Sequence, residues 1–324
     1  MTIILGYVEH DRGQLNNLSL EMLTFARRLA VGQSLPLHAV LVGEAARPLV
    51  ERLAAYGVTT VHLAQHPQLN DYAPEAWAHS LAERIEALTP QAVIAAASDQ
   101  GSEVMAHTAA RLDLPLAANC IEVQGGDVYL VTRQRWGGSL LEEARLHGAV
   151  KLLTLAGHVV EAEEAPAAAN IEVQEYTPAL EEKDSRVRAA GRVEAAAGKV
   201  SLTDAKVVVT GGRGVGSADG FKLLEELAGL LGGAVGCSRA VTSLGWRPHS
   251  DQVGQTGARV APEIYIACGV SGAIQHMVGC KGAKHILAIN IDPEAPIVSH
   301  ADYAIFGDLL QVVPALSAEI KKTR

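Results

Sequence analysis

The sequence predicts an α/β protein with two domains, each built on a mostly parallel β-sheet covered by helices. Three observations lead to this prediction. Apolar strand-like runs alternate along the chain with segments whose apolar residues recur at helical spacing. The 324 residues are enough for about two domains that each bury a core. Aromatic residues make up only 4% of the chain while Ala and Gly are abundant, which suits close packing of helices on a sheet.

The first α/β series runs from residue 2 to residue 114. Residues 2–8 (TIILGYV) form an apolar run typical of a buried strand, and a polar start followed by apolar residues at roughly 3.6-residue spacing predicts a helix over 16–30. The same alternation predicts further strands over 35–43, 59–65 and 91–98 and further helices over 44–57, 75–88 and 102–114. Strands that alternate with helices form a mostly parallel sheet.

The pattern changes beyond residue 119. Shorter strand-like runs with a Gly-Gly turn and little helical period predict a small antiparallel extension of the sheet. Residues 161–205 are polar, Ala-rich and interrupted by Pro, so we expect them to bury little apolar surface and to form a solvated connector. We therefore place an N-terminal domain at 1–190, with the connector at its end, and a C-terminal domain at 191–324.

A second α/β series starts at Lys206, where strand, glycine turn and helix again follow one another. No fixed repeat of about 20 to 50 residues runs through the chain, so the sequence favours two domains over a solenoid.

Composition excludes several classes of protein. The net charge is -9 and the 27 Lys and Arg residues are scattered, which argues against a nucleic-acid partner or an anionic membrane surface. No apolar run approaches the roughly 18 residues of a membrane span. The four cysteines form no CxxC pair and have no zinc spacing, and the N-terminal segment carries acidic residues too early for a targeting peptide. We expect a cytoplasmic protein with reduced thiols and no metal site.

The glycine loop GGRGVGSADG follows an apolar strand and precedes a helical pattern, so its backbone N–H groups could bind an anion. Its spacing of Gly212, Gly214 and Gly216 departs from the dinucleotide-binding fingerprint, because Ser217 stands where Gly or Ala is required. No acidic residue ends the next strand, where Arg239 stands nearby instead, and no Lys-Ser or Lys-Thr pair completes a Walker loop. The loop alone is compatible with either a phosphate site or a tight bend.

Polar residues also follow other strands of the second series. Ser238 and Arg239 come directly after one strand, Asn290 ends another, and Asp308 stands at the expected N-cap of the last helix. The carboxyl ends of strands in an open α/β sheet lie at the edge where ligands bind. Arg239 could equally pair with a surface acid, and Asp308 could serve only as a cap.

The segment GVSGAIQH lies where a buried strand becomes a helix. We expect Ser271 at an N-cap-like position, with Gln275 and His276 in the first helical turn, where unpaired backbone N–H groups create a positive potential. A single His at such a place could instead be a satisfied polar residue of the core. The nearby segment QVGQTG adds Gln255 and Thr256 between glycines, a set that can bind a flat heterocycle or simply satisfy a loop.

Taken together, the motifs GGRGVGS, GCSRAV, QVGQTG, PEIYIACGVSGAIQH and AINIDPEAPI resemble the α subunit of electron-transfer flavoprotein. The resemblance covers essentially the whole chain, more loosely in the N-terminal half, through AQH, AHTAARLDLP and VTRQRWGGS. It implies a nucleotide-hydrolase-like N-terminal domain and a Rossmann-like C-terminal domain that binds FAD. It also implies a heterodimer with a β subunit that carries AMP or a second FAD. Such a complex passes electrons from dehydrogenases, such as the acyl-CoA dehydrogenases of fatty acid β-oxidation, to a quinone oxidoreductase or another acceptor.

The resemblance also implies which residues contact FAD. Carried over position by position, the contacts are Arg213, Ser238, Arg239, Val253, Gly254, Gln255, Thr256, Ser271, Gly272, Ala273, Ile274, Gln275, His276, Asn290, Asp308 and Leu309. It places Thr256 near flavin N5, Arg239 beside the ring and His276 near the pyrimidine carbonyl, and gives these three a role in redox tuning. One-electron reduction leaves negative charge on the N1 and C2 carbonyl side of the ring, which a guanidinium, a donating His and a helix N-terminus would stabilise. Ser243 and Gly216 depart from the Asp and Lys that relatives carry, which changes the local charge.

Two other interpretations stay open from the residues. The glycine loop and Arg239, as a partner for a 2′-phosphate, would suit an NADP-dependent oxidoreductase subunit. The second interpretation is a nucleotide-binding subunit in which FAD has only a structural role. The resemblance favours an electron carrier over an enzyme with its own substrate. Because an isolated α chain would expose part of the flavin and an apolar flank, we expect an obligate partner.

Overall fold

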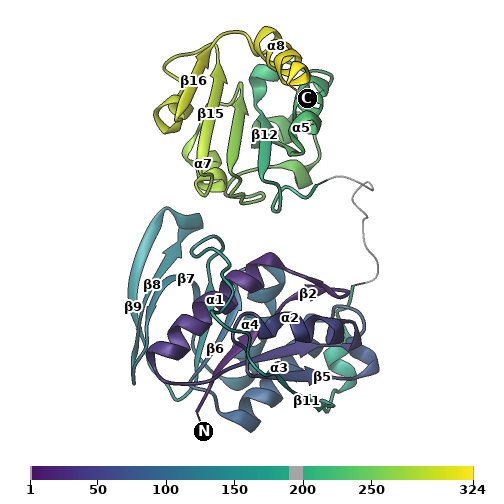
Figure 1. The fold of residues 1–324 in the computed structure, drawn as a ribbon, viewed down its shortest axis with the longest axis vertical. Coiled ribbons are helices and arrows are strands. Elements are labelled where there is room, and N and C mark those ends of the chain that lie inside the picture. Colours follow the sequence, from purple (N-terminus) through teal and green to yellow (C-terminus); the bar gives the residue numbers. More distant parts are fainter. Residues whose placement is uncertain (1, 190–199, 324) are drawn as a thin grey trace. The chain divides into compact units, whose positions relative to one another are not determined.

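The computed structural model describes residues 2–189 and 200–323 (Figure 1). The chain divides into two compact units, Met1–Arg192 and Val193–Arg324. Each unit is a β-sheet covered by helices, which confirms the expected fold class. The domain boundary that we expected between residues 190 and 191 lies outside the described residues. In the described part of the chain no helix combines the length and the apolar character that crossing a bilayer requires.

The N-terminal unit contains a nine-stranded sheet in the order β11-β5-β4-β1-β6-β10-β7-β8-β9. From β11 to β7 neighbouring strands are parallel, whereas β7, β8 and β9 pair antiparallel, so the expected antiparallel extension is confirmed. The strands are β1 (Ile4–Tyr7), β4 (Leu37–Val42), β5 (Thr60–Ala64), β6 (Ala92–Ala96), β7 (Leu116–Gln124), β8 (Tyr129–Arg135), β9 (Leu140–Leu146), β10 (Lys151–Leu155) and β11 (Glu172–Tyr176), with a small hairpin of β2 (His10–Asp11) and β3 (Gln14–Leu15) beside them.

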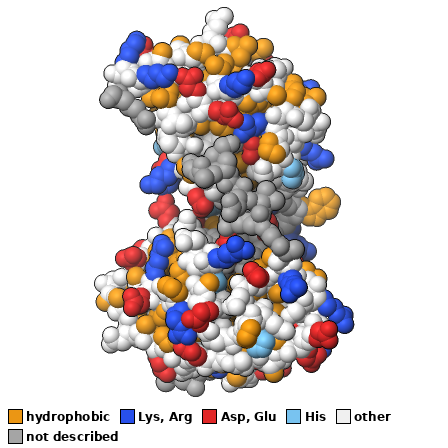
Figure 2. All heavy atoms as spheres, turned by 90° about the vertical axis from the view of Figure 1, so that its right-hand side faces the viewer, with side chains coloured by type: hydrophobic (Ala, Val, Ile, Leu, Met, Phe, Trp, Pro, Cys, Tyr) orange, Lys and Arg blue, Asp and Glu red, His pale blue; other side chains and the backbone are white. Residues whose placement is uncertain are grey.

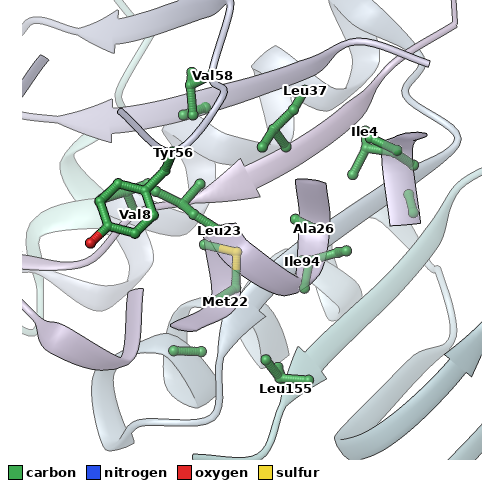
Figure 3. Packing of buried hydrophobic residues seen from close by; sticks show 14 of the residues in the cluster. Ile4, Val8, Met22, Leu23, Ala26, Leu37, Tyr56, Val58, Ile94 and Leu155 are labelled. Carbon is green, nitrogen blue, oxygen red and sulfur yellow. The ribbon is translucent and has the colours of Figure 1, made fainter. Parts of the chain in front are cut away.

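Helices cover both faces of this sheet. Side chains of successive strand residues point to opposite faces, so Ile4 packs in one apolar cluster and its neighbour Leu5 in another. The first cluster includes Met22 and Leu23 of α1, which Figure 3 shows among the buried side chains of that cluster. The helices are α1 (Asn17–Gly32), α2 (Val50–Ala54), α3 (Pro74–Leu88) and α4 (Asp99–Leu112). A core on both faces explains why the central parallel strands, such as β1 and β6, are apolar throughout.

Two expectations for this unit are wrong in part. The predicted helix over 44–57 is a 3-10 turn, Glu44–Leu49, followed by the short α2. The predicted connector contains β11, which pairs with β5 and belongs to the sheet. Most side chains of this edge strand stay partly or fully exposed, so backbone hydrogen bonds hold it without an apolar pattern. Farther along, the buried Asp184 is bonded by His79 and Arg111 of the same unit.

The C-terminal unit contains five parallel strands in the order β13-β12-β14-β15-β16. α5, α6 and α8 pack on one face and α7 on the other. The elements are β12 (Val207–Gly211), α5 (Phe221–Leu231), β13 (Ala234–Cys237), α6 (Arg239–Ser243), β14 (Ile264–Cys268), α7 (Ile274–Cys280), β15 (His285–Asn290), β16 (Tyr303–Phe306) and α8 (Leu309–Lys322). The chain progresses to one side from β12 to β13 and to the other from β14 onward. This reversal makes the gap between β12 and β14 the topological switch point, where doubly wound sheets bind ligands at the carboxyl ends of the strands.

Acidic and basic side chains are interspersed over the face drawn in Figure 2. This distribution agrees with the scattered Lys and Arg of the sequence, and it differs from the single-sign field that a nucleic-acid surface needs.

Candidate functional site

A cleft of about 490 Å³ lies at the carboxyl edge of the C-terminal sheet. It is lined by Gly212, Arg213, Gly214, Ser238, Ala240, Gly269, Ser271, Asn290, Ile291, Asp292, Ala295, Pro296, Gly307, Asp308 and Leu309. These residues come from the loops or helix starts that follow all five strands of the sheet. The cleft therefore opens where the topology predicts a ligand site.

The floor of the cleft is formed by two loops whose backbones touch. A Cβ atom on Gly212 would lie 2.1 Å from the carbonyl oxygen of Gly269, and one on Gly214 would lie 2.7 Å from the Cα atom of Gly269. Gly269 itself has a φ of +61°. Gly212 donates its N–H to the carbonyl of Cys268 at 2.9 Å. Only glycine permits this approach, so the glycines leave the cleft open to a ligand that contacts backbone.

The sequence pattern had suggested that the glycine loop leads directly into a helix, but in the structure it does not. A 3-10 turn, Arg213–Val215, follows the strand, and α5 begins only at Phe221. Gly216 has a φ of +84° and ends the 3-10 turn, which directs the chain away before the helix starts. Any anion in the cleft would therefore meet the N–H groups and side chain of this turn rather than the first turn of α5.

Two guanidinium groups stand at this edge. Arg213 lines the cleft, and Arg239 is the first residue of α6, directly after the cleft residue Ser238. Both side chains are exposed, and neither forms a hydrogen bond or ion pair with the residues that the structure describes. The alternative of a surface ion pair for Arg239 is thus not realised within residues 2–189 and 200–323. Guanidinium groups without an acidic partner favour an anionic ligand, since they bind phosphate in a bidentate fashion.

Asn290 and Asp308 fix the loops around the cleft. Asn290 is 9% exposed and donates from Nδ2 to the carbonyl of Val270 at 2.9 Å, while its Oδ1 accepts from the N–H of Asp292. Asp308 is the N-cap of α8, and its Oδ1 accepts from the N–H of Leu310 at 2.9 Å. The expected cap is confirmed, and both side chains keep further lone pairs or N–H groups for a ligand.

Ser271 lines the cleft but does not cap α7, so that expectation is wrong. Gly272 adopts a φ of +80° between Ser271 and the helix, and Ala273 occupies the N-cap position without a side-chain bond. A Cβ atom on Gly272 would lie 2.3 Å from the backbone nitrogen of Ile297, which donates to the Ser271 carbonyl. Ser271 is thereby held by its backbone, and its exposed hydroxyl is free to face a ligand.

The segment QVGQTG packs against the first turn of α7. Gln255 donates its backbone N–H to the carbonyl of Gln275 at 2.7 Å, and the backbone of Gly254 lies against Gly279. Val253 and Gly254 are buried, whereas Gln255 and Thr256 are exposed. The fold thus brings together two segments that lie about twenty residues apart in the sequence, at a helix N-terminus with unpaired N–H groups.

Gln252 holds Thr256 in place, a role that sequence reasoning missed. Gln252 is 2% exposed, and its side-chain amide bonds the hydroxyl of Thr242 at 2.7 Å and the hydroxyl of Thr256 at 2.9 Å. The amide therefore connects α6 with the loop that carries Thr256. The clustering of amides in QVGQTG was the only signal for this network, and it did not identify the partners.

His276 is buried in the first turn of α7. Its ring is 7% exposed, and its Nε2 lies 2.8 Å from the hydroxyl of Tyr265 on β14. Burial lowers the pKa of His276 to about 4, an effect that the backbone of Val253 partly opposes, so the ring is neutral near pH 7. Nδ1 is buried and forms no hydrogen bond of normal geometry with the described residues. The side chain is therefore only half satisfied as a core residue.

The structure brings part of the expected set together in one cleft. Six of the residues line it, namely Arg213, Ser238, Ser271, Asn290, Asp308 and Leu309. Arg239 adjoins it, and Gly272, Ala273, Ile274, Gln275 and His276 continue from Ser271 into α7. Val253, Gly254 and Gln255 contact α7 and Thr256 follows them in the chain, but none of the four lines the cleft. The cleft and the start of α7 are thus two connected parts of one sheet edge.

The cysteines of this unit are not candidates for nucleophilic chemistry. Cys237, Cys268 and Cys280 are buried and unpaired, and burial raises the pKa of each thiol to about 12. Among the residues that the structure describes, no three His, Cys, Asp or Glu side chains are grouped to hold a metal ion.

The features of the cleft define a class of protein. A doubly wound α/β unit with a glycine-floored cleft at its switch point and two guanidinium groups that no acid of the described residues neutralises has the features of a nucleotide-binding unit. Residues 201–281 match a family model described as "Electron transfer flavoprotein FAD-binding domain", and residues 4–181 match one described as "Electron transfer flavoprotein domain". The chain belongs to the electron transfer flavoprotein family and is similar throughout to its alpha subunits.

Individual relatives agree with this assignment over nearly their full length. The chain is 35% identical over 321 residues to "Electron transfer flavoprotein subunit alpha" of Thermoanaerobacterium thermosaccharolyticum, covering 98% of this chain and 97% of the relative. It is 40% identical over 321 residues to the protein of that name from Mycobacterium tuberculosis, covering 99% of both chains. It is 35% identical over 322 residues to that of Bacillus subtilis, covering 99% of this chain and 97% of the relative.

Proposed function

We propose that this chain is the FAD-carrying α subunit of a heterodimeric electron carrier, which takes electrons from a dehydrogenase and delivers them to a quinone oxidoreductase or another acceptor. The observation that carries the proposal is the glycine-floored cleft at the β12–β14 switch point, because its glycine floor and nearly half of its lining residues fall in the segment that matches the FAD-binding family model. The carrier has no substrate of its own, and the flavin supplies the redox chemistry when it is bound.

The residues present fit a dinucleotide cofactor. The glycines leave room where a Cβ atom would otherwise block the floor, and Arg213 can neutralise an anionic group in the cleft. The buried Nδ1 of His276 lacks a hydrogen-bond partner in the described chain, as a donor awaiting a ligand acceptor would. We therefore assign the sixteen residues of the family resemblance to FAD contacts, with Arg213, Ser238, Ser271, Asn290, Asp308 and Leu309 holding the part of FAD that lies in the cleft.

Three residues would tune the electron affinity of the bound flavin. Arg239 places a positive charge that no described acid neutralises at the start of α6, and Thr256 offers a hydroxyl held by Gln252. Because His276 is neutral near pH 7, it would stabilise the reduced flavin as a hydrogen-bond donor rather than as a cation. These groups would stabilise the reduced flavin ring more than the oxidised ring, and this difference raises the reduction potential of the flavin.

A partner subunit would complete the site. Near the cleft the C-terminal unit exposes large apolar side chains, including Ile274, Ile291, Phe306 and Leu310, each between 48% and 75% exposed. Phe306 stands opposite Asn290 in the pairing of β16 with β15. Exposed apolar side chains around a site favour a protein partner. The partner that we propose is the β subunit, carrying AMP or a second FAD.

The donors that we propose include acyl-CoA dehydrogenases of fatty acid β-oxidation. We place the complex in the cytoplasm, where thiols stay reduced, because Cys120, Cys237, Cys268 and Cys280 are all buried and unpaired.

Capture of the native complex tests the proposal. The chain should co-purify with a second, β-like subunit and with FAD, and the bound flavin should be reduced by a donor dehydrogenase and reoxidised by an acceptor. A flavin that is bound but exchanges no electrons would indicate a structural cofactor. A complex that contains NADP and no flavin would support the oxidoreductase alternative instead.

A further inference from the structure

Tyr265 and His276 form a buried pair behind the proposed flavin site. Tyr265 lies on β14 and is fully buried, and its hydroxyl is 2.8 Å from Nε2 of His276. The two ring centroids are 6.2 Å apart. The second ring nitrogen of His276, Nδ1, is buried without a partner in the described chain. Nε2 is therefore paired within the protein, and Nδ1 is available for a hydrogen bond with a ligand.

The position of the proton in this bond follows from what surrounds the tyrosine. A buried phenol O–H needs an acceptor, since leaving it unpaired costs about 1–3 kcal/mol. Cys280 directs its Sγ toward the carbonyls of His276 and Met277, and Oγ1 of Thr210 forms no hydrogen bond of normal geometry. The hydroxyl of Thr210 and the thiol of Cys280 also adjoin the Tyr265 hydroxyl, but the lone pair of His276 Nε2, at 2.8 Å, is the strongest acceptor beside it. If Nε2 carried the proton instead, the Tyr265 O–H would have only the weaker acceptors Thr210 and Cys280, and the buried Nδ1 lone pair would be unpaired.

A neutral imidazole carries one proton, so an Nε2 that accepts from Tyr265 leaves the proton on Nδ1. The pKa of His276, lowered to about 4, makes the neutral ring the relevant form near pH 7. The backbone of Val253 lies beside the His276 ring. Val253 and Gly254 are among the proposed flavin contacts, so the ring of His276 adjoins the segment to which the proposed function assigns the flavin.

We propose that Tyr265 is a positioning residue for electron transfer: by donating to Nε2 it holds His276 as the Nδ1–H tautomer and presents that N–H to the flavin as a hydrogen-bond donor. The inference rests on the proposed function, because it assigns the acceptor of the Nδ1–H bond to FAD. Tyr265 itself does not touch the cofactor.

The tautomer can be measured directly in the wild-type chain by ¹⁵N NMR of the histidine rings, with and without FAD. We expect a single Nδ1–H tautomer for His276 in both states, and a change of the Nδ1 signal when FAD binds. An Nε2–H tautomer would overturn the inference whether or not the chain binds flavin. A wild-type protein with the expected tautomer but no flavin would contradict the proposed function and leave the Tyr265–His276 arrangement intact.

The variant Tyr265→Phe tests the consequence in the holo complex. We expect FAD to remain bound, the single tautomer of His276 to be lost, and the ratio of one-electron-reduced to oxidised flavin at a fixed electrode potential to fall about tenfold, which corresponds to ~59 mV. Tyr129→Phe is the matched control, because Tyr129 is also fully buried and bonds Gln33 at 2.9 Å in the other unit, and it should not change the ratio.

A double mutant separates positioning from a general packing effect. In a His276→Gln background the further change Tyr265→Phe should shift the ratio less than twofold, since the two residues act as one unit. A full tenfold shift in that background, or an unchanged tautomer and ratio in the single variant, would overturn the inference. If Tyr265→Phe does not fold, the tautomer of His276 measured in the wild-type chain still tests the inference.

Discussion

Gly212 and Gly269 lie in backbone contact across the switch point of the C-terminal sheet, so closely that a Cβ atom on Gly212 would stand 2.1 Å from the Gly269 carbonyl oxygen. This contact sets the floor of the cleft. A side chain of any size at Gly212 would have to push apart the loops that follow β12 and β14.

We therefore expect Gly212→Ala to weaken FAD binding at least tenfold and to lower the free energy of unfolding by about 1–3 kcal/mol, as overpacking does. Gly229→Ala is the matched control. A Cβ atom at this position in α5 meets nothing within 4 Å, so the exchange should stabilise the helix by about 0.5–1 kcal/mol and leave FAD binding unchanged. FAD titration and urea unfolding measure both effects. Wild-type affinity in Gly212→Ala would mean that this floor does not shape the site.

Removing a donor or a charge beside the flavin should lower its first reduction potential. We expect Arg239→Ala and His276→Ala each to lower that potential by several tens of mV with FAD still bound, since a tenfold change corresponds to about 59 mV for one electron. Lys321→Ala on α8, where Lys321 pairs with Glu226, is the control for a lost surface charge and should leave the potential unchanged. Unchanged potentials with intact FAD in both test variants would count against their redox roles.

Asp308 has a structural role that can be separated from ligand binding. Because its carboxylate accepts the N–H of Leu310, Asp308→Ala should lower the free energy of unfolding by about 1 kcal/mol. Asp308→Asn should keep most of the cap and remove the charge. Urea unfolding of both variants checks the cap, and FAD titration of Asp308→Asn shows what the charge contributes. Equal stability of Asp308→Ala and wild type would contradict the capping role.

The alternation of strands and helices was enough to predict both sheets and the strand ends at Asn290 and Ser238, and the loss of that alternation beyond residue 119 predicted the antiparallel extension. The edge strand β11 escaped prediction because Glu172–Tyr176 is held by backbone bonds to β5 and shows no apolar period. Ser271 was mistaken for a helix cap because Gly272 adopts a left-handed φ that delays the start of the helix. The sequence alone does not reveal this φ, since glycine tolerates almost any backbone conformation.

The supporting residues behind the site were the hardest to predict. Tyr265 reads as one more apolar strand residue, and only the packing of β14 against α7 places its hydroxyl on His276. Gln252 likewise lies in a segment with two other candidate polar groups, and the fold decides which of them is buried. Pairings between side chains far apart in sequence depend on tertiary structure, which local patterns do not contain.

The N-terminal unit should lose stability in mild acid because of a histidine pair in which His62 is buried and His38 is half-buried. His38 Nδ1 and His62 Nε2 lie 3.1 Å apart on neighbouring strands β4 and β5. Burial lowers the pKa of both, that of His62 to about 3, with Arg84 lowering it further and Glu172 opposing the shift at His38. A His with a folded pKa below its unfolded value of about 6.5 binds more protons when unfolded, so stability falls as the pH drops below 6.5 and is constant above it.

Thermal unfolding at pH 7.5 and pH 5.5 measures this dependence. We expect the Tm of the N-terminal unit to be lower at pH 5.5 than at pH 7.5. His62→Leu should make this difference in Tm smaller, whereas His300→Gln, on the exposed surface of the other unit, should leave the difference unchanged. A pH dependence that is identical in His62→Leu and wild type would show that another group controls acid stability.

The central claim is that the edge of the C-terminal sheet holds a flavin, and the visible absorption spectrum of the complex purified with its partner subunit tests it most directly. We expect the two absorption bands of oxidised flavin and one FAD per copy of this chain in the site proposed here, and both should decrease in parallel when the Cβ atom of Gly212→Ala blocks the floor of the cleft. A colourless complex that takes up no FAD from solution would contradict the assignment of this site and, with it, the electron-carrying function.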